Sequence, residues 1–351
     1  MIAESMAERV VGLISVVAPQ IITSDVAKRI VQLEKKYGVL DWRVALEIAK
    51  EISQNKICKF ETEKEAIETG IRTGFAYITL GVVSAPLEGF TELELMDRND
   101  GKGKYFKLKY SGPIRNAGGT AAAVSVLIAD YVRICKGFAK YDPTEDEIKR
   151  TFIELQDYHD RVTNLQYFPT EEEVDFLMRN LPIQIGGEPT EKFNVSNYKG
   201  LRRISTDKIR SGFSLIHSSC IPLKAPKLWK QIQSWGDEFE TIKKEWGFLK
   251  EFIEIRKKTK TAAKKEEQEH AEEKPKITPI ETFLKDTVAG RPTFGEPMKG
   301  FRLRYGRSRT SGFSTQSIHP ATMHVLENTI AIGTQLKVER PGKAASITIC
   351  D

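Results

Sequence analysis

The stretch SGPIRNAGGT, residues 111–120, joins a predicted strand to a predicted helix. Before it, aromatic or apolar residues alternate with lysines over residues 105–110, which is the pattern of a half-buried strand. After it, apolar residues recur every three or four positions, and Thr120 stands where a residue can cap the helix N-terminus. The sequence therefore predicts a strand, a glycine loop and a helix, with the loop amides at the start of the helix.

Two interpretations fit this glycine loop. Free amides at a helix N-terminus, together with the guanidinium of Arg115, suit a phosphate group. Alternatively, Gly118 and Gly119 form a tight turn that lets the helix and the strand pack closely. A P-loop requires a lysine directly before its Ser or Thr, and this loop has no lysine before Thr120. The G-x-G-x-x-G motif of a dinucleotide-binding fold is also absent from the sequence. A nucleoside-triphosphate pocket is therefore disfavoured.

Longer runs of the sequence resemble one protein family. The first block comprises GPIRNAGGTAAAVSVLIADYVR (112–133), LQYFP (165–169), RNLPI (179–183) and GEPTE (187–191). The second comprises GRP (290–292), GFRLRYGRSR (300–309), HPATM (319–323), IGTQ (332–335) and ERPGK (339–343). In this order, both blocks resemble the large subunit of the archaeal family D DNA polymerases. The similarity runs from about residue 6 to the C-terminus, apart from a variable gap near residue 260.

The composition indicates an intracellular globular protein. The chain has 351 residues, 40% of them hydrophobic and 29% charged, which is enough for two or more domains with their own cores. Glu4 and Glu8 make the first segment acidic, unlike a signal peptide, and no run reaches the roughly 20 apolar residues that span a bilayer. The four cysteines are scattered, so we expect reduced thiols and neither a zinc site nor a disulfide framework. We expect a cytoplasmic location and no membrane association.

We predict an α+β, multidomain fold with five parts. They are a helical N-terminal segment (1–57), a mixed α/β domain that carries the glycine loop (58–200), a helical segment with a heptad seam (201–255), a charged linker (256–280) and a basic, β-rich start of a polymerase core (281–351). Within the mixed domain we expect a hairpin turn at 98–103 and a second hairpin that pairs 183–185 with 193–195. Helices are expected to begin after Asp41, near Thr144 and near Thr170.

Three surface features remain open at this point. The N-terminal helices form either packed core or a docking surface. The seam runs along one predicted helix from Leu228 to Ile253, with two tryptophans, and it contacts either the core or a partner. The basic segment around Arg203 and Arg210 either contacts a nucleic-acid backbone or is a solvated face. The paired acids Asp97 with Asp100 and Asp157 with Asp160 are expected to be solvated.

The C-terminal part is the basic part of the chain. Residues 291–343 contain nine Lys or Arg and three Asp or Glu, a net charge of +6 that equals the net charge of the whole chain. Residues 301–305 alternate aromatic or apolar residues with Arg302 and Arg304, so a strand there would have one basic face. Such a row suits a sugar–phosphate backbone, or else an ion-pair network. The residues that we predict to bind DNA are Arg115, Gly118, Gly119, Arg291, Arg302, Arg304, Arg307, Arg309, Arg340 and Lys343.

The family resemblance adds expectations that the residues alone do not supply. It implies the N-terminal portion of the large subunit of a replicative DNA-directed DNA polymerase, either a fragment or a split-gene product, which positions primer–template DNA. It implies a core of paired β-barrels with Mg²⁺ bound outside this chain, and we assign no catalytic or metal-binding residue here. Implied partners are a small subunit with 3′–5′ exonuclease activity and a sliding clamp. The alternatives are a non-catalytic nucleic-acid-binding or assembly module and, less favoured, a phosphate-binding enzyme.

Overall fold

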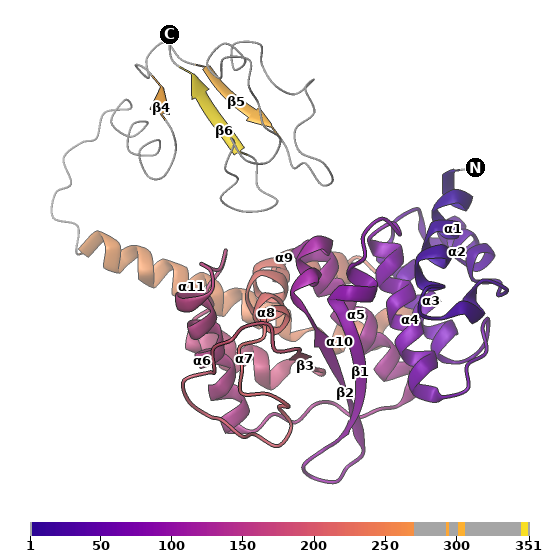
Figure 1. The fold of residues 1–351 in the computed structure, drawn as a ribbon, viewed down its shortest axis with the longest axis horizontal. Helices are drawn as coiled ribbons and strands as arrows, with labels where there is room; N and C mark the ends of the chain where they lie inside the picture. The colour runs from indigo at the N-terminus through magenta and orange to yellow at the C-terminus, as the bar shows by residue number, and fades with distance from the viewer. Residues whose placement is uncertain (1, 270–292, 295–300, 306–344, 350–351) are drawn as a thin grey trace. The chain divides into compact units, whose positions relative to one another are not determined.

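The computed structural model describes residues 2–269, 293–294, 301–305 and 345–349, and the chain divides into two compact units, residues 1–262 and 263–351 (Figure 1). The α-helices are α1 (Ile2–Ile14), α2 (Val26–Tyr37), α3 (Trp42–Ser53), α4 (Glu63–Ile78), α5 (Gly119–Lys136), α6 (Glu145–Arg161), α7 (Glu171–Asn180), α8 (Ser211–Leu215), α9 (Ile221–Gln233), α10 (Glu240–Glu245) and α11 (Phe248–Glu269). The strands are β1 (Phe90–Asp97), β2 (Lys104–Tyr110), β3 (Gln184–Gly187), β4 (Thr293–Phe294), β5 (Phe301–Tyr305) and β6 (Ala345–Ile349). Short 3-10 or π turns are η1 (Pro19–Ile21), η2 (Ala85–Gly89), η3 (Gly112–Ala117), η4 (Ile216–Cys220) and η5 (Asp237–Phe239). The predicted α+β class is confirmed.

Helix starts follow the sequence signals closely. The Asp41 carboxylate accepts a hydrogen bond from the Arg43 amide and caps α3. Thr144 and Thr170 each form a capping box, with Glu147 and Glu173 at the third position of α6 and α7. The predictions at these three starts are confirmed, because caps are encoded within a few neighbouring residues.

A three-stranded mixed sheet stands at the centre of the first unit, in the order β1-β2-β3. β1 and β2 form an antiparallel hairpin closed by the predicted turn, in which the Arg98 amide donates to the Gly103 carbonyl. The predicted second hairpin is wrong, because β3 pairs with β2 in parallel instead. Residues 193–195 pair with the segment around Lys208, through an isolated bridge from Asn194.

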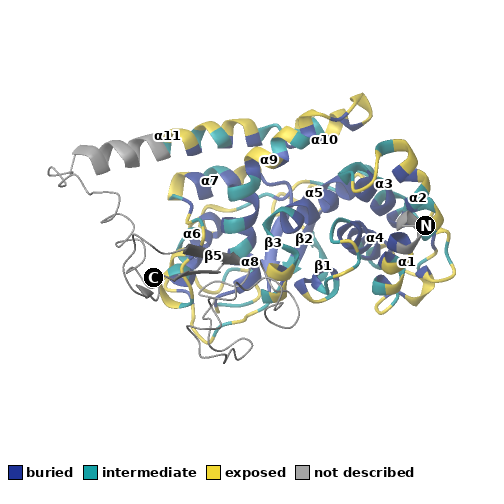
Figure 2. Cartoon of the chain, turned by 90° about the horizontal axis from the view of Figure 1, so that it is seen from above, coloured by how far each residue is buried: buried dark blue, intermediate teal, exposed yellow. Residues whose placement is uncertain are grey.

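Helix α5 is the element around which the first unit packs. It is buried from Ala121 to Arg133, and it contacts α3, α4, β2 and α9. Figure 2 shows it as a dark blue helix in the middle of the unit, with α1–α4 on one side and α6–α8 on the other. The hydrophobic core is continuous from Met6 to Phe252. The N-terminal helices therefore share one core with the sheet.

The apolar seam is buried, but it does not lie on one helix. Leu228, Ile232, Trp235, Phe239, Ile242, Trp246 and Leu249 are each at most 3% exposed. They lie on α9, η5, α10 and α11 and in the turns between these elements, so the prediction of a continuous heptad helix is wrong. The breaks fall near Gly236 and Gly247, and glycine has a low helix propensity. The interpretation of the seam as core is confirmed.

The segment predicted as a charged linker, from residue 256, begins as a helix. α11 continues to Glu269, and the division between the two units falls at residues 262 and 263. Arg256 is only 8% exposed, donates to the Pro222 carbonyl at 2.8 Å and lies over the Tyr167 ring. The first residue of the predicted linker is thus part of the packed first unit.

The second unit is described at three strands. β6 pairs with β5 in antiparallel register and with β4 in parallel register. The predicted strand at residues 301–305 is confirmed. In the described part of the chain, no helix has the length and apolarity needed to cross a bilayer.

Gly212, at the start of α8, touches the end of β2 so closely that only hydrogen fits. A Cβ atom there would lie 2.4 Å from the Tyr110 carbonyl carbon and oxygen and 2.6 Å from the Ser111 nitrogen, all backbone atoms that cannot rotate away. We expect Gly212→Ala to lower the free energy of unfolding by about 1–3 kcal/mol, measured by urea denaturation. Gly236→Ala is the matched control, because nothing lies within 4 Å and the backbone is extended. Equal stability of the two variants would contradict this account of the α8–β2 contact.

Candidate nucleic-acid interface

The predicted DNA-binding residues fall into three groups. Arg115, Gly118 and Gly119 lie together at the start of α5, and Arg302 and Arg304 lie together on β5. The structure does not place the two groups relative to each other. The remaining predicted residues lie outside the described part of the chain: Arg291, Arg307, Arg309, Arg340 and Lys343.

The two glycines of the loop have different physical reasons to be glycine. Gly118 has φ +77°, a conformation that side chains with a Cβ rarely adopt. A Cβ on Gly119 would lie 2.8 Å from the Ser219 carbonyl oxygen, so this residue permits close packing of α5 against η4. Gly118, not Thr120, is the N-cap of α5, and no side chain caps the helix, which corrects the prediction for Thr120. Close packing thus accounts for Gly119 without a ligand.

Arg115 is exposed at the surface next to this loop. Its Nη2 donates to the Tyr158 hydroxyl of α6 at 3.2 Å. Burial raises the pKa of Tyr158, with smaller opposing effects from Arg115 and from a hydrogen bond with Ser211. Arg115 therefore lies beside the place where the chain enters α8. Its DNA-binding role stays a prediction.

On β5, the strand register positions the two arginines. Arg302 is opposite Thr348 and Arg304 is opposite Ser346 in the antiparallel pair with β6. Positions two residues apart on a strand share one face of the sheet. The register thus agrees with the alternation from which the basic row was predicted.

The sequence did not predict a row of buried charged residues on α6. Glu147, Arg150, Glu154 and Asp157 of α6 are at most 8% exposed, and their spacing of three, four and three residues places them on one helix face. We call these four residues the α6 charged stripe. The spacing is visible in the sequence, but it is the spacing of an apolar stripe, and charges at such positions are ordinarily solvated. Asp157 was expected to be solvated, and this expectation is wrong.

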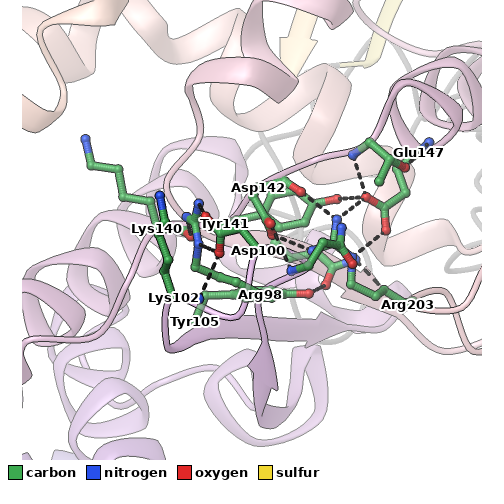
Figure 3. Close-up of polar contacts among 12 residues, drawn as sticks. Arg98, Asp100, Lys102, Tyr105, Lys140, Tyr141, Asp142, Glu147 and Arg203 are labelled. Atoms are coloured by element: carbon green, nitrogen blue, oxygen red, sulfur yellow. Dashed lines mark hydrogen bonds and ion pairs between the residues drawn. The ribbon is translucent and has the colours of Figure 1, made fainter.

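Arg203 pairs with the first residue of this stripe, as Figure 3 shows. Its Nε donates to Glu147 Oε1 at 2.9 Å, its Nη1 donates to Asp142, and its guanidinium lies 5.0 Å from the centre of the Tyr141 ring. Burial alone would lower the pKa of Arg203, but the hydrogen bonds to Glu147 and Asp142 outweigh it and raise the pKa. Arg203 is 5% exposed, so it is neither a nucleic-acid contact nor a solvated residue.

The other members of the stripe hold the same stretch of chain. Glu154 accepts from the Arg210 amide at 2.9 Å and from its guanidinium at 2.6 Å. Arg150 donates to the backbone carbonyls of Tyr198 and Thr206. Asp157 accepts from the amide and the hydroxyl of Ser196. We call residues 188–210, between β3 and α8, the anchored segment, because these bonds attach it to α6 along its length.

The sequence predicted that Arg210, like Arg203, contacts a nucleic-acid backbone or lies on a solvated face. Both interpretations are wrong for Arg210. It is 3% exposed, and its guanidinium also lies over the Phe213 ring at 4.0 Å. A buried arginine needs a buried acid, and its partner Glu154 lies far away in the sequence. Among the described residues, no three His, Cys, Asp or Glu side chains gather where they could hold a metal ion.

Two family models together match almost the whole chain. Residues 1–255 match the family model described as DNA polymerase II large subunit DP2, N-terminal, and residues 267–351 match its central domain. The chain belongs to the DNA polymerase II large-subunit family. The resemblance noted in the sequence is confirmed.

Relatives in the DNA polymerase II large-subunit family match almost the whole chain. The protein named DNA polymerase II large subunit from Nanoarchaeum equitans is 44% identical over 99% of this chain. Those from Methanococcoides burtonii and Archaeoglobus fulgidus are 41% and 42% identical over 100% and 99% of it. The chain spans 29%, 29% and 28% of the length of these three relatives.

The α6 charged stripe makes a sharp prediction for this DNA polymerase II family member. Arg203→Met leaves Glu147 buried without its cation, so we expect the free energy of unfolding to fall by about 3–5 kcal/mol, measured by urea denaturation. Adding Glu147→Gln, which removes the charge and keeps the capping geometry, should recover part of the loss. Arg202→Met is the matched control, because Arg202 is exposed and should change stability by less than about 0.5 kcal/mol. Equal effects at the two arginines would refute the buried pair.

Proposed function

We propose that this chain is the N-terminal portion of the large subunit of a replicative DNA polymerase, and that it positions primer–template DNA. Family membership over the whole chain is the observation that carries the proposal. Catalytic carboxylates and their Mg²⁺ would come from the rest of a longer polypeptide, since the relatives extend well beyond the matched part. A small subunit with 3′–5′ exonuclease activity and a sliding clamp are the partners that we propose for the complete enzyme.

Within the proposed function, the basic strand β5 supports a contact with the sugar–phosphate backbone. Arg302 and Arg304 share one face of the sheet, and β5 is edged in sequence by Gly300 and Gly306, which allow a close approach. Arginine is suited to phosphate because its planar guanidinium can donate two parallel hydrogen bonds. We include Arg115, Gly118, Gly119, Arg291, Arg307, Arg309, Arg340 and Lys343 in the proposed DNA contacts.

Reconstitution tests the proposed function directly. The purified chain is combined with the polypeptide that carries the rest of the family sequence in the same organism, and extension of a labelled primer is followed with nucleotides and Mg²⁺. We expect extension only when both polypeptides are present. A stable complex without extension would favour the alternative, a non-catalytic nucleic-acid-binding or assembly module.

The role of β5 has its own measurement. Arg302→Ala with Arg304→Ala should weaken binding of a fluorescent primer–template in anisotropy titrations, and should reduce the slope of log affinity against log salt by about 2. Lys227→Ala with Lys230→Ala removes the same charge from exposed positions of α9 and serves as the control. An unchanged salt slope in the β5 variant would argue against a backbone contact there.

A further inference from the structure

The exposed charges of the anchored segment all have the same sign. Lys192, Lys199, Arg202 and Lys208 are exposed, and within the described part of the chain their side chains make no hydrogen bond or ion pair. The other two basic residues, Arg203 and Arg210, are the buried anchors. This segment therefore presents four cations to solvent that fold stability does not use.

The acids of the segment are turned to the protein instead. Glu191 accepts from the Ser211 hydroxyl at 2.9 Å. Asp207 accepts from the Gly200 amide at 2.8 Å and from Arg150. Glu188, at the beginning of the segment, is half-buried. The sequence of the segment is mixed in charge, but its acids are partly buried and Glu191 and Asp207 are bonded to the protein, whereas four of its cations are exposed without a bonding partner in the described part of the chain.

An exposed aromatic residue directly follows Lys192 in the sequence. Phe193 is 49% exposed, although the unit has a large core in which it could be buried. Its carbonyl accepts from the Ile209 amide, and the next residue, Asn194, forms the bridge to Lys208. Asn194 is thus opposite Lys208, and Phe193 is opposite Ile209, on adjacent extended stretches of the same segment. Proteins bind single-stranded nucleic acid with cations, which contact its phosphates, and with exposed aromatic rings, which stack on its bases.

The backbone of the segment is fixed in spite of its irregular course. It is longer than the roughly 12–15 residues beyond which irregular loops are uncommon and tend to be functional. Tyr198 is held at φ +56°, a strained conformation for a residue with a bulky side chain, and Arg150 bonds to its carbonyl. A rigid loop loses little conformational entropy when it binds a ligand.

Neighbouring elements add cations beside the anchored segment. Arg161 of α6 donates to the Asn194 carbonyl and the Ser196 hydroxyl, and its side chain is 45% exposed. Arg115 lies beside Tyr158, at the end of the segment. The exposed acid next to Arg161 on α6 is Asp160. Cations therefore predominate across this face, and they include a residue that was predicted from the sequence to contact DNA.

We propose that the anchored segment, in the first unit, is a contact site for single-stranded nucleic acid. Lys192, Lys199, Arg202 and Lys208 contact phosphates, and Phe193 stacks on a base. The inference rests on the proposed function insofar as a primer–template carries a single-stranded stretch of template. The contact itself requires neither catalysis nor the remainder of the polymerase, so it can be measured on this chain alone.

The test uses the full chain and a fluorescent oligothymidylate, which has little structure of its own, in anisotropy titrations at several salt concentrations. The triple variant Lys192→Ala, Arg202→Ala, Lys208→Ala should lose at least tenfold in affinity at low salt, with a salt slope smaller by about 2. The control is Lys227→Ala, Lys230→Ala, Lys250→Ala, which removes the same charge from exposed positions of α9 and α11. An equal loss of affinity in both variants would show that binding depends only on the net charge of the chain, and would overturn the proposal.

Phe193 supplies an independent readout. Phe193→Ala should weaken binding about fivefold or more without changing the salt slope, and Phe193→Trp should retain affinity. All altered residues are exposed, so thermal unfolding should stay unchanged and loss of folding cannot explain the result. An unchanged oligothymidylate affinity in the triple variant would refute the contact site. An equal loss toward a poly-glutamate peptide, with no effect of Phe193→Ala, would identify an acidic protein as the occupant and overturn the proposal.

The outcome is separable from that of the proposed function. If reconstitution gives no primer extension while the triple variant still loses oligothymidylate binding, the contact site stands and the polymerase role fails. If extension is reconstituted and the triple variant binds normally, the polymerase role stands and the contact site fails. When the triple substitution is added to the Arg302 and Arg304 variant, it should cause the same loss of oligothymidylate affinity as in the unaltered chain, because the two sets of residues do not overlap.

Discussion

The burial of charge on one face of α6 constrains the first unit more than any other interaction. Removing carboxylates and guanidinium groups from water costs several kcal/mol for each ion unless a partner of opposite charge is in contact. The α6 charged stripe finds its partners in Arg203, Arg210 and the backbone of the anchored segment. Because those partners are far away in sequence, α6 cannot bury this face until the anchored segment has folded onto it. The shape of a long irregular loop is thus determined by electrostatics.

A further buried ion pair lies within α5, and its acid also bonds to the C-terminal helical part of the unit. Asp130 is fully buried, accepts from Arg133 at 2.6 Å and from the Trp246 indole nitrogen at 2.9 Å. Burial raises the pKa of Asp130, and the Arg133 guanidinium opposes that change. Trp246 follows α10, so this bond fixes the C-terminal helices on α5 at the point where the predicted long helix is broken. Both sides of the unit therefore depend on polar groups inside an otherwise apolar core.

The sequence predicted what is encoded locally. The caps at Asp41, Thr144 and Thr170, the turn at 98–103 and the strand at 301–305 depend on residues within a few positions of each other, and all are confirmed. The parallel partner of β3 and the buried position of Arg203 depend on residues far away in the chain. A run of arginines has the same appearance in the sequence whether it faces solvent, DNA or a buried carboxylate. One sequence signal could have predicted the buried charges: the charged residues of α6 are spaced three and four positions apart, as residues on a buried helix face are.

The two basic surfaces of this chain are made in physically different ways. On β5, positions 302 and 304 are two residues apart on one strand, so the proposed basic row is readable from the sequence alone. In the anchored segment, the local sequence is mixed in charge, but Glu191 and Asp207 are bonded to the protein, whereas Lys192, Lys199, Arg202 and Lys208 are exposed. The inner ion pairs therefore do more than stabilise the fold. They bury Arg203 and Arg210 and engage Asp207 in bonds within the fold, so a stabilising network in the interior also determines which cations of the segment remain at its surface.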